Sequence, residues 1–183
     1  TLAVVYGQGD ATASLRDLLA TLDAKGGDAD AAYPPFSVEV RLYAGLLAAY
    51  RGDAAGVDDA LRKTRDSQVL RDYPTVAQLR QVVSAEQERL AGRPAAAVAQ
   101  LAPLARHDTA LVAVHWALAR AQADVGDKQA AEVQRSWLAT HRGRVFAEST
   151  TSDVLRFFNI AASVQASDVA QALSSSGRAN VTQ

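Results

Sequence analysis

The fold is decided by residues 85–97, AEQERLAGRPAAA, and by residues 119–131, ARAQADVGDKQAA. Each stretch has an alanine seven residues before a glycine and another alanine five residues after it. A glycine between two alanine-rich segments can end one helix and allow the next to begin. The two glycines, Gly92 and Gly126, are separated by a period of about 34 residues, which is typical of stacked helical hairpins. The sequence therefore predicts pairs of helices joined by short glycine turns.

Two earlier glycine steps extend this pattern. Gly52-Asp53 has the same small-residue spacing, with Gly45 before the turn and Val57 after it, although Gly52 is further from Gly92 than Gly92 is from Gly126. Gly9-Asp10 would end a helix over residues 2–6 whose beginning lies outside this sequence. We therefore predict one helical-repeat domain over residues 1–173 with a truncated first repeat, followed by a flexible tail over residues 174–183. Its turns are expected near Gly9, Gly52, Gly92 and Gly126.

Apolar periodicity predicts helices along the whole chain. Alanine occurs 39 times, and it has the highest intrinsic helix propensity. The alternation of apolar and polar residues that marks strands is absent. Gly143 is expected to stop the last clear helix. The predicted fold is all-α, with irregular C-terminal helices, and the expected helices cover residues 11–24, 37–51, 53–67, 75–91, 94–106, 109–125, 128–141, 153–162 and 167–173.

Composition excludes several classes of function. A net charge of −1 gives no basic surface for nucleic acid. No run of about 18 apolar residues is present, so we expect a soluble protein without membrane insertion. The chain has no cysteine and no methionine, and the missing methionine at position 1 suggests a piece of a longer protein, whose alanine content suggests a bacterial source. The compartment stays open, with the cytoplasm favoured over the periplasm.

No motif predicts catalysis. His107, His115 and His141 lack the spacing and the nearby carboxylates of a metal site. Gly7-Gln8-Gly9-Asp10 lacks the third glycine and the lysine of a phosphate-binding loop, so we interpret it as a turn. No G-x-S-x-G sequence is present. We therefore predict no enzyme activity, no catalytic residue, no metal and no cofactor.

The small residues and turn glycines of units 78–111 and 112–145 resemble the tetratricopeptide repeat. This resemblance implies a right-handed superhelical array of α-α hairpins, and a more general hairpin array is the alternative. It also implies that the first helix of each hairpin lines a concave groove for a partner. For the apolar members and the tryptophan of that groove, burial between helices is the competing interpretation. The implied groove residues are Glu39, Leu42, Leu46, Leu79, Val82, Glu86, Arg89, Ala113, Trp116 and Arg120.

A second candidate region is cationic. Arg135, His141, Arg142 and Arg144 cluster around Trp137 in the sequence. Because arginine presents a fork of donors that matches carboxylate and phosphate groups, this set could bind an acidic peptide or another anion. The alternative is a helix C-terminus carrying cations that suit its dipole.

Taken together, these observations predict a non-enzymatic scaffold that binds a protein or peptide, with a second copy of the chain as one candidate partner. The alternative is an accessory, sensor or self-association segment fused to a signalling enzyme or a transcription regulator.

Overall fold

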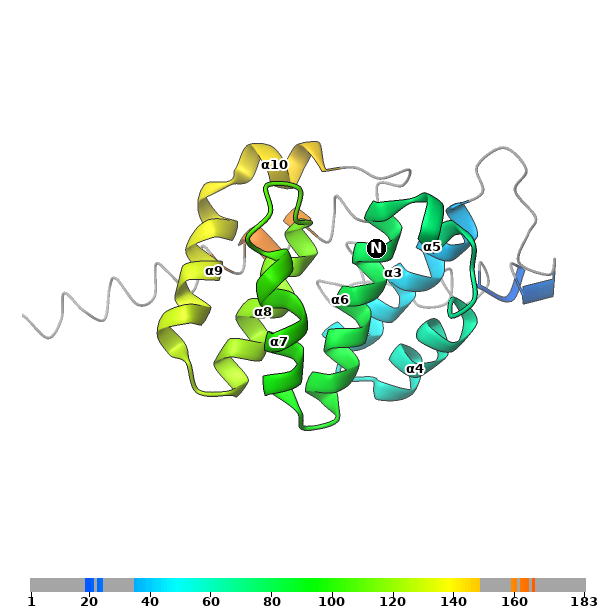
Figure 1. Ribbon diagram of the computed structural model, residues 1–183, viewed down its shortest axis with the longest axis horizontal. Coiled ribbons are helices and arrows are strands. Elements are labelled where there is room, and N and C mark those ends of the chain that lie inside the picture. The colour runs from blue at the N-terminus through cyan, green and yellow to red at the C-terminus, as the bar shows by residue number, and fades with distance from the viewer. Residues whose placement is uncertain are drawn as a thin grey trace, which may run out of the picture.

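The computed structural model describes residues 19–21, 23–24, 35–148, 159–160, 162–164 and 166. Every regular element within these residues is a helix (Figure 1), so the predicted all-α class is confirmed. The predicted turn at Gly9, the tail, and most of the predicted helices 11–24, 153–162 and 167–173 lie outside the described residues. The helices with complete bounds are α3 (Phe36–Tyr50), α4 (Ala54–Lys63), α5 (Val69–Asp72), α6 (Pro74–Leu90), α7 (Pro94–Leu104), α8 (Val112–Asp124), α9 (Lys128–Thr140) and α10 (Arg142–Ala147).

Three helix pairs are joined by turns of the same geometry: α3 with α4, α6 with α7, and α8 with α9. Gly52, Gly92 and Gly126 have φ angles of 76°, 76° and 87°, a conformation that residues with a Cβ rarely adopt. Each glycine N–H donates to the carbonyl three residues earlier, at 3.0 to 3.1 Å. The next N–H donates to the carbonyl five residues earlier, at 2.9 Å in all three turns. Each first helix therefore ends in a Schellman motif.

The residue after each turn glycine is the N-cap of the second helix. Asp53 and Asp127 accept hydrogen bonds on their side chains from the backbone N–H groups of Gly56 and Ala130, at 3.0 and 2.9 Å. These bonds satisfy donors that a helix start leaves free. In the middle hairpin, Pro94 occupies the first helical position, where its missing N–H costs nothing. A single residue thus separates each turn glycine from the second helix.

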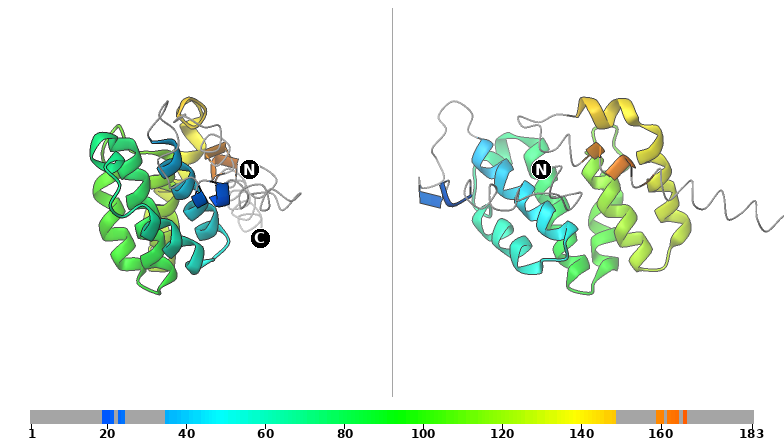
Figure 2. Two further views of the ribbon diagram at one scale, coloured as in Figure 1. Left: turned by 90° about the vertical axis from the view of Figure 1, so that its right-hand side faces the viewer. Right: turned by 180° about the vertical axis from the view of Figure 1, so that it is seen from behind.

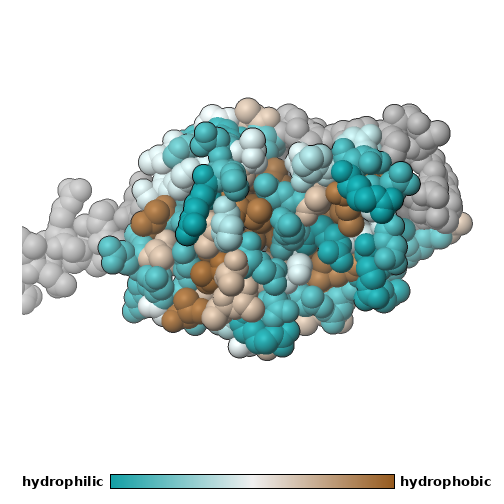
Figure 3. Space-filling model, viewed as in Figure 1, coloured by the Kyte–Doolittle hydropathy of each residue, from teal (hydrophilic) through white to brown (hydrophobic). Residues whose placement is uncertain are grey.

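The hairpins follow one another along the long axis of the molecule (Figures 1 and 2). The first helices pack side by side, α3 against α6 and α6 against α8, and each second helix also contacts the first helix of the following hairpin. Helix α3 is buried along most of its length. Gly45 permits this packing, because a Cβ at this position would lie 2.8 Å from the Cβ of Ala60 on α4. On the face where α7 lies in front, hydrophilic residues surround smaller hydrophobic areas (Figure 3), as expected of amphipathic helices.

Two local predictions differ from the structure. The helix predicted over residues 53–67 ends earlier, because α4 ends at Lys63. The hydroxyl of the next residue, Thr64, donates to the carbonyl of Ala60 at 2.8 Å. The short helix α5 then follows before α6. The prediction that Gly143 stops a helix is wrong. Helix α9 ends at Thr140, and Gly143 lies within α10 without a positive φ.

The turn glycines predict a mutational contrast. Alanine at Gly92 must take a left-handed conformation, which costs roughly 1–2 kcal/mol for an L-residue. A Cβ would meet no atom within 4 Å at either Gly92 or Gly143, so crowding does not differ between them. We expect Gly92→Ala to lower the free energy of unfolding in urea by about 1–2 kcal/mol. Gly143→Ala should leave it unchanged or raise it by roughly 0.5–1 kcal/mol. Equal effects of the two substitutions would contradict the left-handed conformation of Gly92 and the helical conformation of Gly143.

Candidate functional site

Glu86 is a carboxylate buried between first helices. Its side chain is 1% exposed on α6, six residues before the turn glycine. Its Oε2 accepts from Arg89 Nε at 2.9 Å and lies 3.6 Å from Arg120 Nη1 of α8. Arg89 Nη1 in turn donates to Asp124 Oδ2 of α8 at 2.9 Å. Burial raises the pKa of Glu86 above its usual range, against the opposing effect of both arginines. This ion cluster joins α6 to α8.

Arg120 extends the same cluster to α3. Its Nη2 lies 3.4 Å from the carbonyl oxygen of Ala49, near the end of α3. Its guanidinium carbon lies 4.4 Å from the ring centroid of Trp116, within cation–π range. The Trp116 ring is nearly parallel to that of Tyr50, with centroids 6.2 Å apart. Arg120 therefore contacts groups from all three first helices.

A cavity of about 300 Å³ adjoins these aromatic and cationic side chains. Its described lining comes from α3, α8, α9 and the helical residues near position 160. The wall combines two arginines and two aromatic rings with small or aliphatic side chains. The lining residues are Tyr50, Trp116, Ala119, Arg120, Arg135, Leu138, Ala162 and Ala166.

The structure brings together only part of the predicted groove. Glu86, Arg89, Trp116 and Arg120 form the connected set described above. Leu42 and Leu46, like Leu79, Val82, Ala113 and Trp116, belong to the hydrophobic core, and Glu39 is buried on α3. Arg89 and Arg120 retain partial exposure, at 12% and 28% of their side chains. Of the predicted groove residues, the two arginines are therefore accessible at the surface and the leucines are not.

Tyr50, Asp124 and the alanines at 162 and 166 also belong to this region, although the sequence did not lead us to predict them. A signal for Asp124 existed in the sequence. Asp124 follows its partner Arg89 by 35 residues, which is the repeat period plus one position. No comparable signal was available for Tyr50. Its contact with Trp116 depends on how α3 and α8 are placed around α6.

The four predicted cations do not form one open patch. Arg135 donates to Glu132 Oε2 at 3.2 Å and lines the cavity. Arg144 donates to the carbonyl oxygens of Asp108 and Ala110, the latter at 2.6 Å, and so fixes the loop before α8. Arg142 Nε lies 3.3 Å from the carbonyl oxygen of Ala139, and its side chain is exposed. His141 Nδ1 lies 2.9 Å from the carbonyl oxygen of Trp137.

His141 also belongs to a stack of three rings. Trp137 lies between His115 and His141, with centroid distances of 3.6 and 4.3 Å and nearly parallel planes. His115 Nδ1 lies 2.8 Å from Gln134 Oε1. Burial lowers the pKa of His115, which favours the neutral imidazole. These histidines are thus engaged in packing between α8 and α9.

Glu148 caps a helix from a distance. Leu111 precedes α8 and has no side-chain acceptor of its own. Both carboxylate oxygens of Glu148 instead accept from the backbone N–H of Val112, at 3.0 and 2.9 Å. Gln78 Oε1 on α6 accepts from the N–H of Leu111 at 2.6 Å. The start of α8 is therefore held by residues from α6 and from the end of α10.

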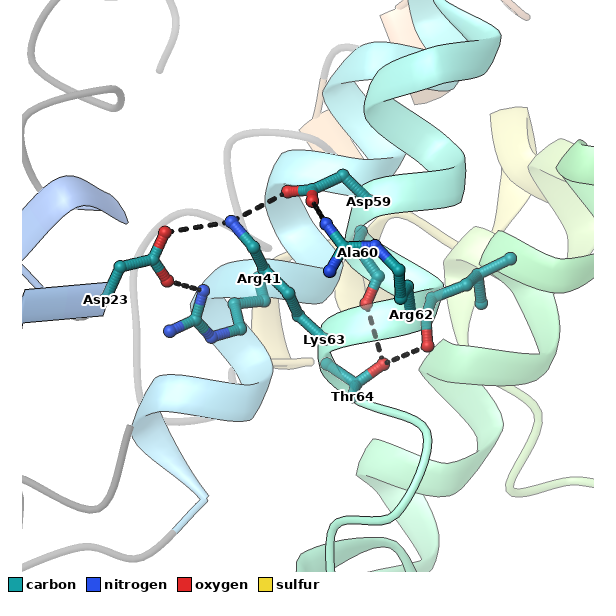
Figure 4. A network of polar contacts seen from close by, with 8 residues as sticks. Asp23, Arg41, Asp59, Ala60, Arg62, Lys63 and Thr64 are labelled. Carbon is teal, nitrogen blue, oxygen red and sulfur yellow. Dashed lines mark hydrogen bonds and ion pairs between the residues drawn. The ribbon is translucent and has the colours of Figure 1, made fainter. Parts of the chain in front are cut away.

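A second region of charge joins the N-terminal residues to the first hairpin (Figure 4). Asp23 accepts from Arg41 Nη1 at 2.6 Å and from Lys63 Nζ at 2.8 Å. Lys63 also pairs with Asp59 at 2.9 Å, and Asp59 pairs with Arg62. Hydrogen bonds from Lys63 and Arg41 lower the pKa of Asp23. A cavity of about 280 Å³ here has both acidic and basic residues in its wall.

No protein-family model, curated protein or solved structure matches this chain. Within the described part of the chain, no helix is both long and apolar enough to cross a membrane. The same residues contain no group of three or more histidine, aspartate or glutamate side chains arranged to hold a metal ion.

The burial of Glu86 predicts an effect on the pH dependence of stability. Because its pKa is raised in the folded protein, its contribution is fully present below the pKa of an unfolded glutamate, about 4.3. That contribution is lost as pH rises through the folded-state pKa. We expect the free energy of unfolding of the wild type, relative to Glu86→Gln, to fall as pH rises. Urea titrations from about pH 4 to pH 8 measure this difference.

Glu88→Gln provides the matched control, since Glu88 lies on the same helix. The hydrogen bond from Arg93 lowers the pKa of Glu88, so its contribution is present at higher pH and is lost as pH falls. The two variants should therefore show trends of opposite sign. A Glu86 trend that follows the Glu88 trend would contradict the dominance of burial.

The remote cap predicts a stability loss on truncation. Glu148→Ala leaves the Val112 N–H without its acceptor, so the free energy of unfolding should fall by about 1–2 kcal/mol, as when a helix cap is removed. Glu132→Ala is the comparison, since it breaks the ion pair with Arg135, in which both side chains are partly exposed, and should cost at most about 1 kcal/mol. Thermal and urea denaturation of both variants test this order. Equal losses would count against the capping role.

Proposed function

We propose that this chain is a non-enzymatic, protein- or peptide-binding module of the tetratricopeptide type. One observation carries the proposal: Glu86 and Arg120 contact each other from equivalent positions, each six residues before the turn glycine of successive hairpins. Contact between equivalent positions is expected when hairpins stack with a regular step. The corresponding faces of the first helices, α3, α6 and α8, then form one continuous surface.

The chemistry of this surface favours an acidic partner segment. Arg89 and Arg120 are partly exposed, and Trp116 lies beneath Arg120. Arginine can donate two parallel hydrogen bonds to one carboxylate, and an aromatic ring beside it provides apolar contact. Stacked hairpins of this kind present extended surfaces suited to peptides. The partner we propose is an acidic peptide segment of another protein.

Selection from a random peptide library displayed on phage tests this function and does not require a named partner. We expect enriched peptides to carry aspartate or glutamate. Their binding to Arg89→Gln and Arg120→Gln should be at least about tenfold weaker, because each change removes a charge-assisted hydrogen bond. Fluorescence polarisation with the selected peptides measures these affinities.

Arg93→Gln is the control for these variants, because Arg93 is an exposed, ion-paired arginine at the start of α7. It should bind the selected peptides as the wild type does. Absence of any enriched peptide, or equal binding by the Arg89 and Arg120 variants, would reject the proposed surface.

A further inference from the structure

The cavity beside Arg120 has a wall of one charge sign. The charged residues among its described lining are Arg120 and Arg135, and no carboxylate is among them. The cavity between the N-terminal residues and the first hairpin differs, since Asp53 and Asp59 line it together with Arg41, Arg51 and Lys63. The described wall of the first cavity therefore carries cations alone, whereas the wall of the second carries charges of both signs.

The two arginines have few hydrogen bonds within the described residues. A guanidinium carries five N–H donors. Arg120 Nη1 is buried at 3.6 Å from Glu86 without a hydrogen-bond partner, and Nη2 makes only the long contact to Ala49. Arg135 makes one hydrogen bond, to Glu132, and that carboxylate is itself 40% exposed to solvent. Both side chains thus retain donor capacity for an added acceptor.

The remaining wall is apolar. Trp116 and Tyr50 contribute aromatic rings, and Leu138 with three alanines contributes aliphatic surface. Ala162 and Ala166 are four residues apart, both are helical, and both belong to the buried core. The hydroxyl of Ser163, between them, donates to the carbonyl of Leu138 at 3.0 Å. Two alanine side chains on this segment leave space where larger residues would fill it.

We propose that this cavity binds a small organic carboxylate with an aromatic or aliphatic body. The carboxylate accepts hydrogen bonds from Arg120 and Arg135, and the body packs against Trp116, Leu138 and the alanines. The volume of about 300 Å³ is at the lower end of ligand pockets, which span about 300–1,000 Å³, so the ligand is small. This site shares Arg120 and Trp116 with the peptide-binding surface proposed above, whereas Arg135, Leu138 and the alanines belong to the cavity alone. The Arg135 and Ala166 variants described below therefore test the cavity independently of peptide binding.

Tryptophan fluorescence of the full chain tests the proposal directly. The sequence has two tryptophans, so Trp137→Phe leaves Trp116, in the cavity wall, as the single reporter. Phenylacetate and cyclohexanecarboxylate are the probes, and phenylacetamide is the neutral match for phenylacetate. We expect both carboxylates to change the Trp116 emission with saturation. Phenylacetamide should bind at least about tenfold more weakly, because its amide has no negative charge and has one acceptor oxygen in place of the two that a carboxylate presents to arginine.

Three variants in the Trp137→Phe background locate the site. Arg135→Gln should weaken phenylacetate binding at least about tenfold. Ala166→Leu fills the cavity and should abolish binding while circular dichroism shows an unchanged helical fold. Arg93→Gln, distant in sequence and exposed, should bind phenylacetate like its parent.

The proposal is overturned by any of three results. These are no saturable response to either carboxylate at millimolar concentration, equal affinity for phenylacetate and phenylacetamide, or unchanged phenylacetate binding by the folded Ala166→Leu protein. If Ala166→Leu does not fold, Ala162→Leu provides the same measurement from the other alanine of the segment.

Discussion

The arrangement of the first helices depends on the burial of the Glu86 carboxylate. A buried charge is costly unless it is paired, and Glu86 obtains its partners from its own helix and from the next hairpin. Arg89 donates hydrogen bonds to both Glu86 and Asp124, and Arg120 contacts Glu86 and the carbonyl of Ala49 near the end of α3. A shift of one first helix would leave Glu86 or an arginine without its partner. The ion cluster therefore links α3, α6 and α8, whatever its net contribution to stability.

Local features of the fold were predictable from sequence. The turns at Gly52, Gly92 and Gly126 are encoded by a glycine followed by aspartate or by arginine and proline, and the helix ends observed there lie within about one residue of those expected. Gly143 shows where such reasoning fails. A glycine after a helix suggests a stop, but the backbone at Gly143 is helical and α10 continues through it. The sequence around a glycine does not determine its φ angle when tertiary contacts of the following segment favour another helix.

The candidate site was predictable only in part, because its contacts join residues that are distant in sequence. The resemblance to tetratricopeptide repeats nominated Glu86, Arg89, Trp116 and Arg120, which meet in the structure. It also nominated Leu42 and Leu46, which are core residues. Periodicity identifies the side of a helix that carries a residue, whereas burial depends on what covers that side. The cap on α8 shows the same limit, since Glu148 acts on an N–H group 36 residues earlier in the chain.

The turns have a consequence for insertions and deletions. Gly52 and Gly92 are further apart in the sequence than Gly92 and Gly126 are, yet the three turns have equal hydrogen-bond geometry. The extra length lies outside the turns. The connection that contains α5 is three residues longer than the connection between α7 and α8. Helix α6 is four residues longer than α8, and α4 is one residue shorter than α7. Each turn has no spare residue, because one residue both completes the Schellman motif and precedes the second helix. Changes in chain length during evolution can therefore accumulate between hairpins or at the far ends of their helices, while each turn keeps its length.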